Sequence, residues 1–300
     1  MRQAVIDIGT NSTRLMIADV SKETVHCTQK RLETTRLGEG ISQNPRLKEL
    51  PMRRTAEAAA HFAQVAKTAG AEQIHIYATA AVREAENAAD FAQLLLSLSG
   101  LTLHILSGEE EARIAYAGAC GSEKNCAVID IGGGSTEVML KSGETLNALS
   151  QKIGAVRLME RFGIGDGHLC RGTVMQATDF LRPYIERYAQ IGAGHAEKLI
   201  GVSGTPTTLA AMELGLSVYD GSRIQGAVLS YQRICELAGN LFEASLTVRK
   251  SMIGVPPERA DIIPFGTLIL MSFMKRYGYD SLTVSDRDSL EGYLQLYGNK

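Results

Sequence analysis

The sequence lacks cysteine pairs with metal-site spacing, long apolar runs and any large net charge. Its five cysteines, at positions 27, 120, 126, 170 and 235, include no CxxC pair, which predicts reduced thiols and neither a disulfide framework nor a zinc site. No apolar stretch approaches the ~20 residues that cross a bilayer, so no membrane contact is expected. A net charge of −2 gives no basic footprint for nucleic acid.

The rest of the composition is that of a globular protein with two domains. Its 300 residues exceed the ~250 at which single cores stop growing, and 45% hydrophobic and 21% charged residues are ordinary values. The opening MRQAVIDIG leads into a strand pattern without the apolar segment of a signal peptide. With the scattered cysteines, this predicts a cytoplasmic protein.

A long-range repeat is the most informative feature. Residues 4–17 read AVIDIGTNSTRLMI and residues 127–140 read AVIDIGGGSTEVML. The hexapeptide AVIDIG is identical, and the later Ser-Thr and Met positions also match. The separation is too long for a solenoid repeat. Each copy therefore predicts a strand, a tight turn and a returning strand at the start of its own domain.

Strand and helix patterns follow each copy and predict an α/β chain with two sheets, each covered by helices. The expected domains are residues 1–120 and 121–285. Elsewhere, residues 101–106 predict a strand, and three longer segments predict helices: 46–69, 173–191 and 260–276.

Each repeat places an aspartate, Asp7 or Asp130, at the end of its first strand, two residues before a glycine. Glycine lets the backbone turn tightly and present bare N–H groups to phosphate, and serine and threonine hydroxyls add donors. The two aspartates are expected to face each other across a cleft, where they would suit a hard divalent cation. The alternative is a pair of ordinary glycine hairpin turns with Asx-type caps.

The repeat changes charge at one position, where Arg14 corresponds to Glu137. Glu137 would complete an acidic group with Asp130, and Arg14 would contact phosphate oxygens; for Arg14 the alternative is a surface ion pair. Arg83 lies where a strand pattern passes into a helix pattern. It is another candidate phosphate ligand, or the surface partner of a neighbouring glutamate.

The segment SGEEEA (107–112) has the spacing of a capping box between Ser107 and Glu110. Acidic residues also suit the first turn of a helix through its dipole. Glu111 is not required by the cap and lies shortly before the domain junction. Glu111 is therefore a candidate general base for water that attacks a terminal phosphate; the alternative is one more acidic residue in the first turn of the helix.

Six motifs follow one another along the chain: DIGTNS (7–12), ATAAVREAEN (78–87), SGEEEA (107–112), DIGGGSTE (130–137), GVSGTPTTLAA (201–211) and PPERADIIPFG (256–266). Together and in this order they resemble the exopolyphosphatase/guanosine pentaphosphate phosphatase family. The resemblance implies the duplicated ribonuclease H-like fold of actin, sugar kinases and heat-shock chaperone ATPases, with two domains flanking a cleft. It also implies hydrolysis of terminal phosphoanhydrides with Mg²⁺.

The resemblance implies a role for each matching residue. Glu111 takes the place of the catalytic base and Arg83 that of a phosphate-facing arginine. The acids that hold Mg²⁺, or another divalent cation, are implied to be Asp7, Asp130 and Glu137. The phosphate loops fall on Gly9, Thr10, Asn11 and Ser12, and on Gly132, Gly133, Gly134, Ser135 and Thr136; a nucleotide or polymer site falls on Ser203, Gly204 and Thr205.

The C-terminal part departs from the family pattern in two ways. Leu290 stands where an arginine is expected, with Arg287 nearby. The further helical domain of long members is also expected to be missing, which suggests a short form. The resemblance implies that the last helix, within 286–300, packs back on the first domain.

The predicted reaction is in-line attack of water on the terminal phosphate of inorganic polyphosphate. One alternative is the same chemistry on guanosine pentaphosphate (pppGpp). Two others are a kinase of the same fold that phosphorylates a small acceptor, and a non-catalytic nucleotide-binding switch. A homodimer is a further possibility, whereas nucleic acid and membrane partners are not expected.

Overall fold

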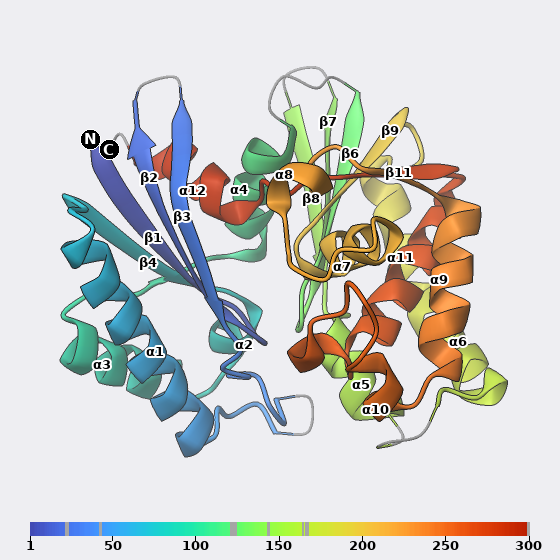
Figure 1. Cartoon of the computed structure of the whole chain (residues 1–300), viewed down its shortest axis with the longest axis horizontal. Coiled ribbons are helices and arrows are strands. Elements are labelled where there is room, and N and C mark those ends of the chain that lie inside the picture. Colours follow the sequence, from blue (N-terminus) through green and yellow to red (C-terminus); the bar gives the residue numbers. More distant parts are fainter. Residues whose placement is uncertain are drawn as a thin grey trace. The chain divides into compact units, whose positions relative to one another are not determined.

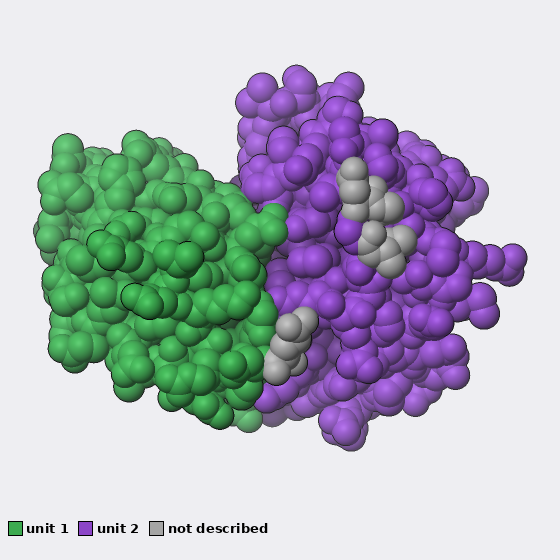
Figure 2. All heavy atoms as spheres, turned by 90° about the horizontal axis from the view of Figure 1, so that it is seen from below, with its two compact units in different colours: residues 1–118, 288–300 green, residues 119–287 purple. Residues whose placement is uncertain are grey.

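The chain forms two compact units, shown in a computed structural model that describes residues 1–21, 24–41, 44–120, 125–142, 145–163, 165 and 168–298. The first unit contains Met1–Gly118 and Asp288–Lys300, and the second contains Ala119–Arg287 (Figure 2). The divisions thus follow residues 118 and 287, where the sequence predicted 120 and 285. Residues 121–124, at the expected junction, lie outside the described residues.

The first unit is built on a mixed sheet with the strand order β3-β2-β1-β4-β5 (Figure 1). Strands β1 to β3 are antiparallel neighbours, whereas β4 and β5 run parallel to β1. The strands are β1 (Arg2–Ile8), β2 (Thr13–Val20), β3 (Val25–Glu33), β4 (Gln73–Ala78) and β5 (His104–Ile105).

Helices pack on both faces of this first sheet, and the alternation along β1 explains why. Ala4, Ile6 and Ile8 share one core with the apolar residues of α1 and α3. Val5 points to the other face, where α12 and α4 contribute Leu290 and other apolar side chains. The helices are α1 (Glu49–Thr68), α2 (Ala80–Arg83), α3 (Ala88–Ser99), α4 (Gly108–Cys120) and α12 (Ser289–Tyr297).

The second unit repeats this sheet and adds one strand. Its order is β10-β11-β9-β6-β7-β8; read from β8, three antiparallel strands are again followed by two that run parallel to the first strand of the repeat. Strand β10 extends the edge antiparallel to β11. The strands are β6 (Cys126–Ile131), β7 (Thr136–Ser142), β8 (Thr145–Gln151), β9 (Lys198–Val202), β10 (Val228–Ser230) and β11 (Ser281–Val284).

The core of the second unit surrounds α11, which is buried along most of its length. Phe273 of this helix contacts three tyrosine rings, including Tyr188 and Tyr279. The helices are α5 (Ala155–Phe162), α6 (Arg171–Glu186), η1 (Arg187–Ile191), α7 (Gly204–Glu213), α8 (Gly221–Ile224), α9 (Tyr231–Glu243), α10 (Leu246–Arg249), η2 (Pro257–Arg259) and α11 (Ile263–Tyr277).

Several predicted boundaries were wrong for identifiable reasons. The strand expected at 101–106 is limited to β5, because only two of its residues pair with β4. Helix α1 begins at Glu49, since the Asn87 side chain binds both backbone groups of Leu47. Helix α11 begins at Ile263, because Pro264 fits only the first turn of a helix.

The helix expected over 173–191 also differs from the structure, because it changes to 3₁₀ geometry after Glu186. Four short elements were not predicted: α8, α10, β10 and η2. Each is too brief to show a period in the sequence. Within the described part of the chain, no helix combines the length and apolar character needed to cross a membrane.

Candidate active site

The two repeats form hairpins with the same turn. In the first, the Gly9 N–H donates to the Ser12 carbonyl at 3.0 Å; in the second, the Gly132 N–H donates to the Ser135 carbonyl at 3.0 Å. A Cβ added at either glycine would lie 3.1 or 3.2 Å from that carbonyl oxygen, closer than an ordinary contact. Glycine therefore keeps each turn tight, as the repeat predicted.

The second loop is held from one side by the start of α5. The carbonyl of each of its three glycines accepts a hydrogen bond from this helix. The Gly132 carbonyl accepts from the Ala155 N–H at 2.9 Å, and the Gly133 carbonyl accepts from the Val156 N–H at 2.9 Å. The Gly134 carbonyl accepts from Nε of Arg157 at 2.7 Å. A trans peptide directs its N–H opposite to its C=O. The following amides therefore point away from α5, and an anion on that side would meet a row of donors.

The first loop is held in the same manner by a different segment. The Thr10 carbonyl accepts from the Gly38 N–H at 2.9 Å, and the Asn11 carbonyl accepts from the Arg36 N–H at 2.8 Å. A Cβ on Gly38 would lie 2.2 Å from Cγ2 of Thr10. The N–H groups of Asn11 and Ser12 are therefore turned away from residues 36–38. These two hydrogen bonds were not predicted from the sequence, because no sequence motif at residues 36–38 indicates them.

Asp7 is the acid of the first hairpin and lies directly opposite Arg14 in the β1–β2 register. Nε of Arg14 donates to Oδ2 of Asp7 at 3.0 Å. Burial raises the pKa of Asp7 above its ordinary value, although the Arg14 charge works against that rise. Its other oxygen, Oδ1, has no partner with full hydrogen-bond geometry within the described part of the chain, although the Tyr77 hydroxyl is near enough to lower the pKa of Asp7. Such a buried oxygen suits a cation or a bound water.

Arg14 also reaches the start of α12. Its Nη1 forms an ion pair with Asp288, and its Nη2 donates to Oγ of Ser289 at 2.9 Å. The Arg14 side chain is 18% exposed, so this is a largely buried network and not the surface pair considered as the alternative. A contact of Arg14 with phosphate stays a prediction.

The second hairpin places Asp130 opposite Glu137. Two carboxylates therefore occupy the positions at which the first hairpin has a carboxylate and a guanidinium group. Both residues are buried, and Oγ of Ser150 donates to Oε1 of Glu137 at 2.6 Å. Directly opposed like charges disfavour each other, and a divalent cation would relieve that cost with the oxygen ligands it prefers. The described residues contain no cluster of three or more His, Cys, Asp or Glu that could hold a metal.

Glu111 lies in the first turn of α4, beside the capping box that the sequence predicted. The box is present, since the Glu110 N–H donates to Oγ of Ser107 and the Ser107 N–H donates to Oε2 of Glu110. Arg83, at the end of α2, donates through Nη1 to Oε2 of Glu111 at 2.8 Å and to the Leu106 carbonyl at 2.9 Å. The structure thus joins two residues that the sequence had singled out separately.

The turn before α7 contains the third predicted group, Ser203, Gly204 and Thr205. Ser203 has a φ of +66°, which is uncommon for a residue with a side chain. A Cβ on Gly204 would lie 1.2 Å from Nη1 of Arg259, so this glycine makes room for a guanidinium. Arg259 belongs to the PPERAD segment, but sequence reasoning did not single it out.

The sequence matches the Ppx/GppA phosphatase family over residues 16–296. The chain belongs to this family. It is 30% identical to Exopolyphosphatase 2 of Mycobacterium tuberculosis, covering 97% of both proteins. It is 31% identical to the Guanosine-5'-triphosphate,3'-diphosphate pyrophosphatase of Photobacterium profundum, covering 96% of this chain and 58% of that protein.

Another relative is the Bifunctional 3-dehydroquinate synthase/phosphatase of Fusobacterium nucleatum, 31% identical over 97% of this chain and 46% of that protein. The chain thus spans about half the length of two of these three relatives. Among solved structures, a Ppx/GppA member from Aquifex aeolicus has a TM-score of 0.82 and 28% identity, covering 100% of this chain and 98% of the other. An exopolyphosphatase-like protein has a TM-score of 0.91 and 27% identity, with coverage of 100% and 99%. The predicted family and the α/β duplicated fold class are confirmed.

Proposed function

We propose that this Ppx/GppA chain releases terminal orthophosphate from inorganic polyphosphate by in-line attack of water, with Glu111 as the catalytic base. The observation that carries the proposal is the Arg83–Glu111 pair. It orients a carboxylate that takes no part in the cap formed by Ser107 and Glu110. An oriented carboxylate within reach of a water is what general-base catalysis requires.

The glycine loops are proposed to bind phosphate oxygens. Their carbonyls are already occupied from one side, so the opposite side of each loop offers N–H donors. Donors fixed before the substrate arrives stabilise developing charge without reorganisation, which is the main source of rate in phosphoryl transfer. The hydroxyls of Ser12, Ser135 and Thr136 remain proposed additional donors, although the Thr136 hydroxyl now donates to the Ile153 carbonyl.

We keep Asp7, Asp130 and Glu137 as the proposed ligands of Mg²⁺ or another divalent cation. The supporting observations are the opposed carboxylates of Asp130 and Glu137 and the unbonded Oδ1 of Asp7. When bound, the cation would neutralise charge on the phosphate. A cytoplasmic location and a homodimer stay predictions.

The second candidate is the same reaction on pppGpp. It is favoured by the likeness to the Photobacterium profundum protein and by the Ser203–Thr205 turn, where Arg259 contributes a cation beside Gly204. The proposed nucleotide or polymer site would then receive the guanosine. A kinase or a nucleotide switch has no comparable support.

Phosphate release with Mg²⁺ from long-chain polyphosphate, pppGpp and ATP, each with a chelator control, tests the proposal. Polyphosphate is expected to give the highest kcat/KM. A higher value for pppGpp would favour the second candidate. Phosphorylation of an acceptor by ATP, or nucleotide binding with no phosphate release from any substrate, would contradict a hydrolase.

A further inference from the structure

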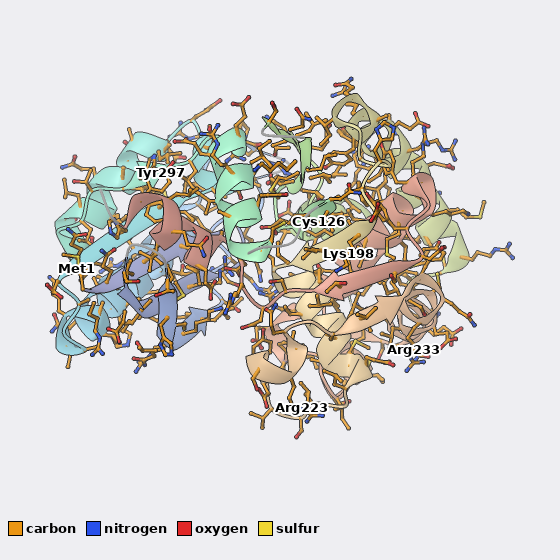
Figure 3. The ribbon with its side chains drawn as sticks, turned by 90° about the horizontal axis from the view of Figure 1, so that it is seen from above. Met1, Cys126, Lys198, Arg223, Arg233 and Tyr297 are labelled. Atoms are coloured by element: carbon orange, nitrogen blue, oxygen red, sulfur yellow. The ribbon has the colours of Figure 1, made fainter. Side chains whose placement is uncertain are left out.

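Two buried thiols lie in contact within the second unit. Cys120 is the last residue of α4 and Cys126 is the first residue of β6. Their Sγ atoms are 2.9 Å apart, and the residues are 5% and 1% exposed. Figure 3 marks Cys126 near Lys198, its register partner in β9. One thiol is therefore carried by a helix end and the other by a paired strand.

The separation of the two sulfurs is close to that in a disulfide. A disulfide bond joins sulfurs at about 2.03–2.05 Å, so the two Sγ atoms need to approach by less than about 1 Å. The other three cysteines differ in setting: Cys27 and Cys170 are exposed and Cys235 is half-buried. Contact between two thiols is an arrangement that sequence spacing did not reveal, because six residues separate them without a recognised motif.

We propose that Cys120 and Cys126 form a reversible disulfide when the protein meets a peroxide. Hydrogen peroxide first oxidises one thiol to a sulfenic acid and releases water. The sulfur of the neighbouring thiol then attacks the sulfenic sulfur, the S–S bond forms, and a second water leaves with the displaced oxygen. Two thiols and one peroxide thus give one disulfide and two waters. Burial limits attack by bulky oxidants, whereas peroxide is small.

The bond would join two elements that carry the proposed machinery. Helix α4 contains Glu111 in its first turn, and β6 contains Asp130 near its end. A disulfide between Cys120 and Cys126 would fix the end of α4 to the start of β6, and such a restraint would slow any reaction that needs these two elements to move. This consequence rests on the proposed function; formation of the disulfide does not.

The test begins with the exposed thiols. A hydrogen bond with the Thr173 hydroxyl lowers the pKa of Cys170, so Cys170 should react early with N-ethylmaleimide. After Cys27 and Cys170 are blocked under native conditions, the full chain is treated with hydrogen peroxide. Thiol titration after denaturation should then show a loss of two thiols, and peptide mapping should show the Cys120–Cys126 cross-link. Dithiothreitol should restore both thiols.

Cys126→Ser should abolish the loss of thiols, and Cys235→Ser is the matched control that should retain it. Peptide mapping of the unsubstituted chain shows whether the Cys120–Cys126 disulfide forms, even if Cys126→Ser does not fold. Cys120 and Cys126 recovered as thiols, as sulfinic acids or in bonds to other cysteines would overturn the proposal. Phosphate release should fall on oxidation and return on reduction. If the reduced chain releases no phosphate, the proposed function is contradicted. Peptide mapping still shows in that case whether the disulfide forms.

Discussion

Nη1 of Arg83 donates a hydrogen bond of 2.8 Å to Oε2 of Glu111, and the two residues are 28 positions apart in the chain. Arg83 ends a single helical turn after β4, and Glu111 lies in the first turn of α4. The same guanidinium binds the Leu106 carbonyl just before α4. The arginine therefore fixes both the carboxylate and the chain that leads to it.

Glu111→Gln should lower phosphate release by roughly 10²–10⁴-fold, because the amide cannot accept the proton of the attacking water. The amide oxygen can still accept the hydrogen bond from Arg83, so the melting temperature should change little. Initial rates and thermal unfolding measure the two effects. Glu109→Gln, at the exposed neighbouring position, should keep near-native turnover. Near-native release by the Glu111 variant would rule out its role as base.

Arg83→Met should also reduce turnover, by roughly tenfold or more, since a hydrogen bond to a charged group is worth about 1.5–3 kcal/mol. Arg46→Met removes an exposed arginine that pairs with Glu86 at 3.6 Å and should leave turnover unchanged. Near-native turnover by the Arg83 variant would contradict the positioning role.

Gly154→Ala tests the support of the second loop. The added Cβ would lie 2.3 Å from the Gly133 carbonyl oxygen, so the loop must shift, at a cost of about 1–3 kcal/mol. Turnover should fall together with stability. Gly239→Ala in α9 meets no atom within 4 Å and should stabilise the protein by about 0.5–1 kcal/mol. Urea unfolding and phosphate release compare the two variants; unchanged release by Gly154→Ala would show that the loop tolerates displacement.

Asp288→Asn should destabilise the protein at neutral pH. The substitution removes one of the two carboxylates that pair with the buried Arg14. The free energy of unfolding should fall by on the order of 3 kcal/mol. Asparagine caps a helix as well as aspartate does, so the start of α12 should keep its cap. Glu57→Gln, which removes an exposed i,i+4 pair with Arg53, should change the unfolding free energy by only a few tenths of a kcal/mol.

The same variant has a defined pH dependence. Burial alone would raise the pKa of Asp288, but the charges of Arg14 and Lys30 hold it below its ordinary value of 3.8. Its stabilising contribution is therefore complete above pH 3.8 and is lost as the pH falls through the lower, folded value. Burial is the main cause of the raised pKa of Asp7, which acts in the opposite sense in both proteins; the Asp288 charge adds to that rise in the wild type alone. The difference in unfolding free energy between wild type and variant should narrow below pH 3.8; a constant difference would contradict this account.

The consequence of Leu290 illustrates what the sequence left open. From the sequence it was clear only that Leu290 replaces the arginine of the family pattern. In the structure Leu290 is buried against Val5, Met16 and Tyr77, and its N–H donates to Oδ1 of Asp288 at 2.9 Å. An apolar side chain thus anchors α12 to the sheet, and the charge next to Asp7 comes from Arg14.

The sequence by itself determined the duplicated hairpins, the two glycine turns and the capping box at Ser107, because strand alternation, tight turns and caps depend on residues close together in the chain. The tertiary structure alone decided that Arg83 binds Glu111, that Arg14 joins Asp7 to Asp288, and that α5 holds the second loop. Those contacts form only when distant elements pack together, and burial then determines which carboxylate each guanidinium must neutralise.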